Sequence, residues 1–202
     1  MVVVKKIPVP PEEKLSHLLT GTDEALSDED RVELIKKKFN LAKNATPDHE
    51  DLQREMNSYD IKLSETPDVT DFSDINKKYA LAQAWISRVN TIEMACIYSE
   101  SAWKDVFSSI KSFIDKRTSE ILMESEVGEL KNARMQEASV RNRLGGVYDA
   151  LLKIESEYNK SKSFTQIVQA KSKELTSVIT NLTRQVKTLS LEYTVTRDLN
   201  RS

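Results

Sequence analysis

Residues that bend, break or cross-link a polypeptide are scarce in this sequence. Its 202 residues include one cysteine, four glycines and five prolines. A single cysteine excludes a disulfide framework within the chain and a zinc site of paired cysteines, and it favours a reducing, intracellular setting. So few glycines and prolines exclude a fold of many short strands and tight turns. All five prolines precede residue 68, so the rest of the chain can form long helices.

Long apolar runs are missing as well. No window of the sequence approaches the ~18 apolar residues that a membrane-spanning helix requires. The apolar start at Val2-Val3-Val4 is too short for a signal peptide. We therefore expect a protein without a membrane partner that resides in the cytoplasm.

Charge divides the chain into a head, residues 1–70, and a body, residues 71–202. The head holds 10 basic and 15 acidic residues, whereas residues 130–202 hold 13 basic and 7 acidic residues. This asymmetry favours an anionic partner for the basic tail or attraction between copies of the chain. The alternative is an ordinary solvated helical surface, which carries charges of both signs in any case.

The head predicts an extended arm followed by short accessory helices. Valines and prolines exclude a helix over residues 1–11, so this arm is either disordered or lies on a neighbouring subunit. A helix is expected after Ser27, whose hydroxyl caps an acidic first turn. Another is expected to begin at Thr46-Pro47 and to end at Thr66-Pro67, with an apolar face that contains Leu52, Met56, Tyr59 and Leu63.

The body contains three heptad runs, at residues 85–113, 130–158 and 168–196, in which apolar residues alternate at spacings of four and three. A 3.5-residue period of this length predicts left-handed supercoiled packing, either within the chain or between chains. The sequence therefore predicts an all-α fold: a helical hairpin, a bundle or a coiled coil. The predicted assembly core consists of Trp85, Val89, Ile92, Trp103, Ile110, Leu144, Val147, Leu151, Ile154, Leu175, Ile179, Leu182, Val186 and Leu189.

The heptad phase is lost between the first two runs. We expect the first long helix to begin at Asp71 or Ser73 and to end near Lys116. Thr118 then has the features of a helix N-cap, and a short helix from there would lead to a reversal at Gly128.

Two further features lie inside the later runs. The polar segment 159–163 predicts an interruption, or else a polar stretch of one continuous helix. Gly145-Gly146 costs a helix roughly 2 kcal/mol relative to two alanines. Because the heptad phase continues across the pair, we expect a continuous helix whose backbone closely approaches another element, with a hinge as the alternative.

Residues for catalysis do not form a recognisable motif. The sequence has no Gly-rich phosphate loop and no nucleophile elbow. Both histidines, His17 and His49, fall in the head, where we expect them to be solvated or to cap helices. Cys96 falls on the first heptad run, which predicts a core thiol rather than a nucleophile. We therefore predict a non-enzymatic protein with no catalytic residues, no metal site and no cofactor.

The basic tail is the place where the sequence predicts a ligand. Its cations and its many hydroxyls suit contacts to phosphates, and the scarcity of aromatic rings, with Phe164 and Tyr193 as the two in the tail after residue 158, predicts binding without sequence preference. The candidate residues for contact with nucleic acid are Arg141, Arg143, Lys160, Lys162, Lys171, Lys173, Arg184 and Lys187.

The segment from about Ile75 to Leu175 resembles phage recombination mediator proteins of the UvsY type. The resemblance rests on the stretch Tyr79–Trp85, on the Lys-Arg-Thr-Ser-Glu turn at 116–120 and on a long helix that closes on Lys171–Leu175. It implies a homo-oligomer that binds single-stranded DNA and helps to load a recombinase, with DNA contacts from basic residues.

Two functions of different classes remain open from the sequence. One is an oligomeric mediator that binds single-stranded DNA without sequence specificity. The other is a structural assembly protein, such as a scaffold, a virion component or a coiled-coil adaptor, with no nucleic-acid role. In both, the expected partners are copies of the chain itself or other helical proteins.

Overall fold

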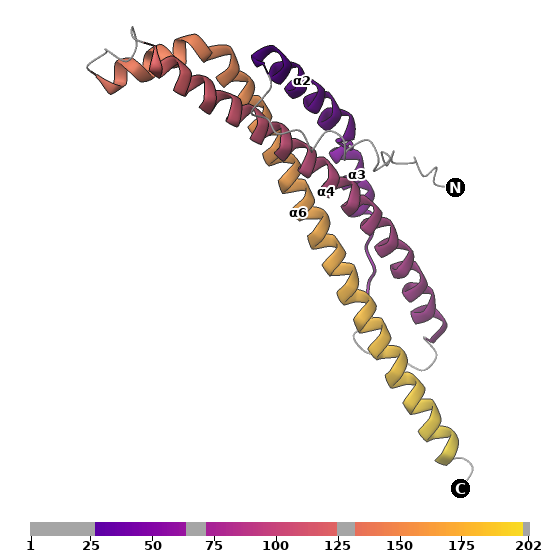
Figure 1. Cartoon of the computed structure of the whole chain (residues 1–202). Helices are drawn as coiled ribbons and strands as arrows, with labels where there is room; N and C mark the ends of the chain where they lie inside the picture. The colour runs from indigo at the N-terminus through magenta and orange to yellow at the C-terminus, as the bar shows by residue number, and fades with distance from the viewer. Residues whose placement is uncertain (1–26, 64–71, 125–131, 200–202) are drawn as a thin grey trace. The chain divides into compact units, whose positions relative to one another are not determined.

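The computed structural model describes residues 27–63, 72–124 and 132–199, and within these ranges the fold is all-α with no strand. Four helices follow one another: α2 (Asp28–Ala45), α3 (His49–Asn57), α4 (Phe72–Met123) and α6 (Ala133–Leu199) (Figure 1). The predicted fold class, long helices with short accessory helices before them, is confirmed. No helix in the described ranges is both long enough and apolar enough to cross a membrane.

The chain divides into two compact units that do not follow the order of the sequence. Unit 1 contains α2, the part of α4 from Ala95 and the part of α6 up to Ser163. Unit 2 contains α3, the part of α4 up to Met94 and the part of α6 from Phe164. Each unit therefore combines one head helix with a segment of both long helices.

The two long helices pair in antiparallel fashion within each unit. In unit 1, Glu124 near the end of α4 pairs with Arg143 of α6, while Phe107 stacks on Tyr158 at 5.9 Å between ring centroids. In unit 2, Ser172 donates a hydrogen bond to Asn90 at 3.3 Å. As the residue numbers decrease along α4, the residue numbers of their partners on α6 increase, which is the pattern of an antiparallel pair. The helices that the heptads predict therefore pair within the chain as a hairpin.

Apolar residues on the heptad stripes fill the interior of each unit. The unit 1 core joins Trp103, Val106 and Ile110 of α4 to Leu144 and Ile154 of α6. The unit 2 core joins Ile75 and Ala82 of α4 to Leu182 and Leu189 of α6. Of the predicted core, Val89, Ile92 and Leu175 are also buried, whereas the half-buried members are Trp85, Val147, Leu151, Ile179 and Val186.

The predicted end of the first long helix near Lys116 is wrong, because α4 continues without a break to Met123. Thr118 lies inside the helix and caps nothing. The phase shift has a packing reason: Ile114 and Ile121 remain buried and carry the apolar stripe past the point where the strict heptad ends. Arg117 also binds Asp28 of α2 at 3.0 Å. The predicted reversal at Gly128 lies outside the described residues.

The second and third heptad runs belong to a single helix, so the predicted interruption at 159–163 is wrong and its alternative, a polar stretch of one helix, is confirmed. Ser161 and Thr165 are 2% and 3% exposed and occupy the heptad positions between Tyr158 and Val168. These residues keep the spacing of three and four that the apolar residues show on either side. The core stripe is therefore continuous, although two of its members are hydroxyl side chains.

The head helices differ from the prediction in their ends. The predicted cap at Ser27 is confirmed, since its Oγ accepts the Asp30 backbone N–H at 3.2 Å. In α3, however, the N-cap is Asp48, whose carboxylate accepts two backbone N–H groups of the first turn, and the helix ends at Asn57. Tyr59 and Leu63 therefore lie after the helix rather than on it, in contrast to the prediction.

The other predicted ends fall at the edges of the described ranges. Ser73 lies inside α4 rather than at its cap, and Asp71 lies outside the described residues. The arm at 1–11 and the predicted helix end at Thr66-Pro67 lie outside them as well.

Thr46 has a different task from the predicted helix start: its hydroxyl lies in a buried hydrogen-bond network of unit 1. Trp103 Nε1 donates to Thr46 Oγ1 at 2.8 Å, and Thr46 Oγ1 donates to the Ala42 carbonyl at 2.8 Å. Ser99 Oγ lies 3.1 Å from Thr46 Oγ1 and 3.2 Å from Ser161 Oγ. The Thr46 hydroxyl has one hydrogen, which it donates to the Ala42 carbonyl, so in the contact between the two hydroxyls Ser99 is the donor and Thr46 the acceptor. The network thus joins α2, α4 and α6.

Gly145 and Gly146 lie within α6 with ordinary helical backbone angles, so the predicted continuous helix is confirmed. The expected close approach of another element is wrong within the described chain, because a Cβ atom built on either glycine meets no heavy atom within 4 Å. In Figure 1 the first part of α6, to which both glycines belong, bends before the helix straightens. Glycine pairs are a common cause of such bends.

Replacing either glycine by alanine should stabilise the protein. Gly145→Ala and Gly146→Ala should each raise the free energy of unfolding by about 1 kcal/mol, because alanine restricts the unfolded chain and finds open space in the folded one. Urea denaturation followed by circular dichroism measures this change. A loss of stability in both variants would contradict an open helical face at this place.

Removing the Thr46 hydroxyl should destabilise unit 1. Thr46→Val leaves the Trp103 indole N–H, on a side chain that is 2% exposed, without its acceptor, which should cost about 1–3 kcal/mol. Thr91→Val is the matched control, because the Thr91 hydroxyl is exposed and donates to a carbonyl of its own helix. Equal stability of the two variants would show that the buried network contributes nothing.

Candidate nucleic-acid interface

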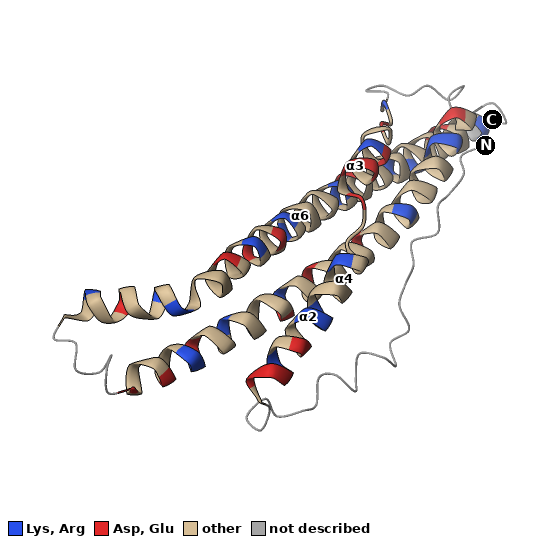
Figure 2. Ribbon diagram, turned by 90° about the horizontal axis from the view of Figure 1, so that it is seen from above, with Lys and Arg blue, Asp and Glu red and all other residues tan. Residues whose placement is uncertain are grey.

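All eight predicted nucleic-acid contacts lie on α6, and four of them fall in each unit. Their places follow from the heptad, with Leu144 taken as position a, so that buried residues occupy a and d. The candidates then occupy five positions: b (Lys173, Lys187), c (Lys160), e (Arg141, Lys162), f (Arg184) and g (Arg143, Lys171). Figure 2 accordingly shows basic and acidic residues interspersed along the helices. The eight residues therefore do not form one basic face.

Three of the eight cations are engaged in ion pairs. Arg143 binds Glu124, Lys160 binds Glu157 at 2.7 Å, and Lys171 binds Glu174 at 2.9 Å. A carboxylate beside each cation offsets its attraction for a phosphate. These three residues are consequently weaker candidates than the sequence alone indicates.

The other five cations are exposed and have no ion pair with any residue that the structure describes. Three of them, Lys173, Arg184 and Lys187, lie in unit 2 at positions b and f, which face away from the a and d stripe. They extend over 14 residues of helix, or roughly 21 Å at 1.5 Å per residue. We refer to Lys173, Arg184 and Lys187 as the outer cation row.

Hydroxyl side chains near the outer cation row are already used by the helix. Six threonines of α6 donate to the carbonyl four residues earlier, at 2.8–3.1 Å: Thr176, Thr180, Thr183, Thr188, Thr194 and Thr196. A phosphate oxygen needs a donor, and these protons are engaged. The predicted help of threonine hydroxyls in phosphate binding therefore has no support from the geometry.

The two aromatic residues of the tail have different surroundings. Phe164 is 4% exposed and stacks on His49, with ring centroids 4.2 Å apart. The expectation of a solvated or capping His49 is thus wrong, and Phe164 is not available to a base. Tyr193 is 61% exposed. His17 lies outside the described residues, and Cys96 is buried as predicted.

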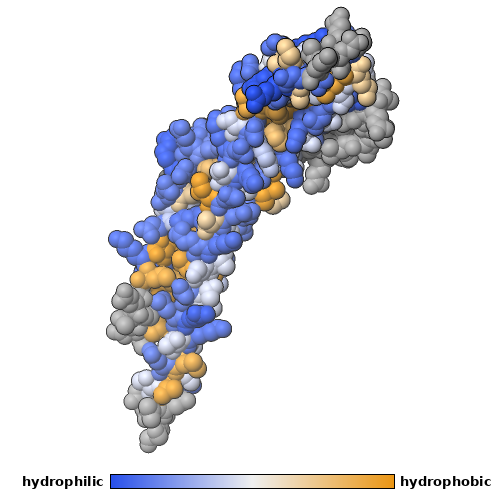
Figure 3. Space-filling model, turned by 90° about the vertical axis from the view of Figure 1, so that its left-hand side faces the viewer, coloured by the Kyte–Doolittle hydropathy of each residue, from blue (hydrophilic) through white to orange (hydrophobic). Residues whose placement is uncertain are grey.

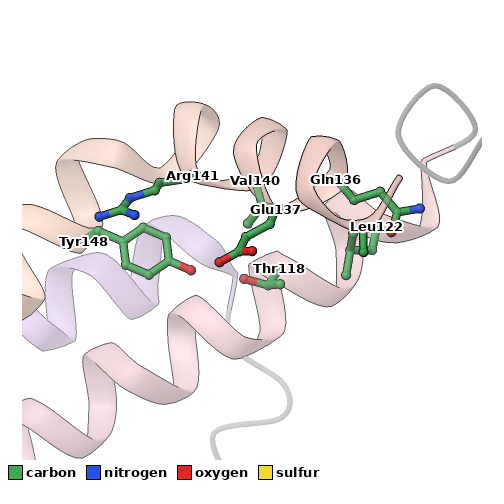
Figure 4. A pocket seen from close by; sticks show the side chains of 8 residues that line it. Thr118, Leu122, Gln136, Glu137, Val140, Arg141 and Tyr148 are labelled. Carbon is green, nitrogen blue, oxygen red and sulfur yellow. The ribbon is translucent and has the colours of Figure 1, made fainter. Parts of the chain in front are cut away.

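An open groove in unit 1 lies between the end of α4 and the first turns of α6, with a volume of about 440 Å³. Figure 4 shows Glu137 of α6 extending into it toward Thr118 of α4 and the Tyr148 hydroxyl. Glu137 occupies an a position, and the groove explains how a charged residue is tolerated in the second heptad run. Among the described residues, no three His, Cys, Asp or Glu side chains are grouped closely enough to hold a metal ion.

Among the described residues, the titratable groups with clearly shifted pKa values lie in unit 2, where α3 meets α4. Arg88 of α4 donates to both carboxylate oxygens of Glu55, at 2.7 and 3.0 Å, and Tyr59 donates to Glu55 at 2.5 Å while it stacks on Trp85. The Arg88 hydrogen bonds lower the pKa of Glu55, and burial raises the pKa of Tyr59 to about 12. Each group has a partner that explains its shift, so this cluster fastens α3 to α4.

The ion pair between Glu55 and Arg88 should make stability depend on pH. Glu55→Gln should lower the free energy of unfolding by about 1–3 kcal/mol at neutral pH. Because the pKa of Glu55 is lowered, this difference is fully present above its ordinary value of 4.5 and disappears as the pH falls through the lowered pKa. Denaturation at several pH values measures it, with the exposed Glu50→Gln as control. A difference that is independent of pH would exclude the ionised carboxylate as the cause.

Comparison with protein-family models, curated protein sequences and solved structures gives no match to this chain. The resemblance to recombination mediators therefore stays a prediction, and the candidate interface rests on the residues described above.

Proposed function

We propose that this chain is a non-enzymatic, self-associating helical protein that binds single-stranded DNA without reading its sequence. The outer cation row is the observation that supports this proposal. Lys173, Arg184 and Lys187 are exposed, have no ion pair with a described residue and share the outward side of α6. Cations in this state attract phosphates and release counterions when they bind them. The assistance in recombinase loading follows from the resemblance alone.

Binding through these residues would not select a sequence. Lysine and arginine contacts to phosphates position a protein on nucleic acid but carry no information about bases. The one exposed ring among the two tail aromatics, Tyr193, gives little scope for stacking along a strand. The preference for single strands over duplexes rests on the resemblance, so a duplex of the same sequence belongs in any test.

One chain offers few phosphate contacts. Three contacts give a slope of log affinity against log salt of about −2 for a single strand, which corresponds to weak binding at physiological salt. Several chains on the same strand would add their contacts and raise the apparent affinity. Self-association is therefore part of the proposal rather than an addition to it.

Neutralising the outer cation row should weaken binding to DNA. A variant that carries Lys173→Ala, Arg184→Ala and Lys187→Ala should bind a labelled mixed-sequence single strand at least tenfold more weakly at low salt, with a salt slope reduced by about 2. Fluorescence anisotropy over a salt series measures both quantities.

The matched control removes three exposed cations of unit 1 that have no ion pair with a described residue. Lys104→Ala, Lys111→Ala and Lys153→Ala should leave the affinity and the slope near those of the unchanged protein. If the unchanged protein does not bind at low salt, or if both triple variants lose affinity equally, the proposal is refuted. Tighter binding to the duplex would refute the preference for single strands.

The second candidate function is a structural assembly protein without a nucleic-acid role. One observation favours it: the apolar residues at the C-terminal end of α6 are exposed. Failure of DNA binding would leave this candidate in place.

A further inference from the structure

Apolar side chains at the surface of the described chain are scattered rather than gathered. On the face that Figure 3 shows, they form several small patches among hydrophilic residues. The exposed ones include Met94 of α4 and Leu152, Ile167 and Leu191 of α6, which belong to different turns and to different units. Single exposed apolar residues are normal on a protein surface. The groove in unit 1 differs from these patches, because polar side chains of two helices converge on it.

Three oxygen-bearing side chains meet in this groove. The Glu137 carboxylate of α6 extends toward the Thr118 hydroxyl of α4 and the Tyr148 hydroxyl of α6 (Figure 4). None of the three forms a hydrogen bond or an ion pair with any residue that the structure describes. Thr118 differs in this respect from the six threonines of α6 whose hydroxyls donate to the carbonyl four residues earlier. The groove therefore presents acceptor oxygens that its own walls do not use.

A primary ammonium group matches these three oxygens. It carries three N–H donors and one positive charge, so it can donate to the Glu137 carboxylate and to both hydroxyl oxygens at once. The opposite charge of the carboxylate strengthens the first of these hydrogen bonds. Glu137 also occupies a heptad position a, where an apolar side chain would extend the core. A bound cation gives this charged residue a function that packing of the seam does not.

The groove also carries a positive charge. Arg141 lies one helical turn after Glu137 and lines the same groove, and the two side chains form no ion pair with each other. In Figure 4 the Arg141 guanidinium lies beside the Tyr148 ring, away from the Glu137 carboxylate. A guanidinium binds a carboxylate through paired hydrogen bonds. The apolar side chains of Leu122 and Val140 line the groove as well. A ligand that uses all these groups has an ammonium, a carboxylate and an aliphatic chain between them.

We propose that this groove binds a small ω-amino acid, whose ammonium contacts Glu137, Thr118 and Tyr148 and whose carboxylate contacts Arg141. Residues four apart on a helix have Cβ atoms about 6 Å apart, which an aliphatic chain of about three to five methylene groups spans. An α-amino acid holds both charged groups on the same carbon and cannot reach both side chains. The groove volume of about 440 Å³ lies within the range of small-molecule sites. This inference does not rest on DNA binding or on self-association.

The exposure of the two charged side chains determines how tightly the ligand should bind. Glu137 and Arg141 are both exposed to water, and ion pairs in this setting are weak. We therefore expect a dissociation constant on the order of 1 mM. Because the ligand contacts side chains of both α4 and α6, it binds the folded protein alone and should raise the thermal midpoint as its concentration increases.

Ligands that lack one charged group test the two contacts separately. Titration of the isotope-labelled protein with ε-aminocaproate, followed by NMR, should give saturable shifts at the amides of Thr118, Val140 and Tyr148. Hexylamine lacks the carboxylate and caproate lacks the ammonium. Each of these two should bind the unchanged protein about fivefold more weakly than ε-aminocaproate.

Two substitutions assign each contact to its residue. In Glu137→Gln, ε-aminocaproate should bind no more tightly than caproate. In Arg141→Gln, it should bind no more tightly than hexylamine. The matched controls Glu155→Gln and Lys153→Gln remove the same charges from α6 outside the groove, and they should bind ε-aminocaproate as the unchanged protein does. Thermal midpoints without ligand should stay close to that of the unchanged protein in all four variants.

Three results would overturn the proposal. The first is the absence of saturable shifts with ε-aminocaproate, or shifts confined to residues outside the groove. The second is equal binding of ε-aminocaproate, hexylamine and caproate to the unchanged protein, a comparison that requires no variant to fold. The third is an equal loss of affinity in the groove variants and the control variants. Because no DNA is present, these results are independent of the outer cation row.

Discussion

The heptad seam between α4 and α6 is the constraint on which the rest of the structure depends. Buried positions recur along α6 from Val140 to Leu189, and α4 meets them in the opposite direction within each unit. Burial of such side chains is worth about 1.5–3 kcal/mol each, which far exceeds the surface ion pairs. The head helices pack on the flank of this seam within each unit, and the charged residues of α6, apart from Glu137, lie outside positions a and d.

Polar contacts favour one register of the packed helices within each unit, whereas apolar contacts alone allow several registers. In unit 1, the hydroxyls of Ser99 and Ser161 face one another inside the seam, and Thr46 extends the network to α2. In unit 2, the paired hydrogen bonds between Arg88 and Glu55 fasten α3. Buried polar groups must find partners, so such contacts favour one register over neighbouring ones. The seam supplies most of the stability, and these groups supply its specificity.

The same arrangement explains why the candidate interface is smaller than the basic tail. Heptad geometry spreads the cations of α6 over every non-core position, and nearby glutamates pair with Arg143, Lys160 and Lys171. Lys173, Arg184 and Lys187 form no ion pair with any residue that the structure describes. The sequence could show an excess of basic residues, but pairing depends on how the side chains extend along and between helices.

The all-α fold, the Ser27 cap, the core place of Cys96 and the continuity of the helix through Gly145-Gly146 were predictable from the sequence, because they depend on local propensity and on a regular period. The antiparallel hairpin, the unbroken passage of α4 beyond Lys116 and the joining of two heptad runs through Ser161 and Thr165 were decided by the tertiary structure. These three features share one physical reason, which is that the burial of a residue depends on the residues packed against it. Ser161, for example, can lie in the core because the Ser99 hydroxyl lies opposite and forms a hydrogen bond with it. The exposure of the C-terminal end of α6 was also decided by the tertiary structure, because α4 begins at Phe72 and does not pack against the last turns of α6.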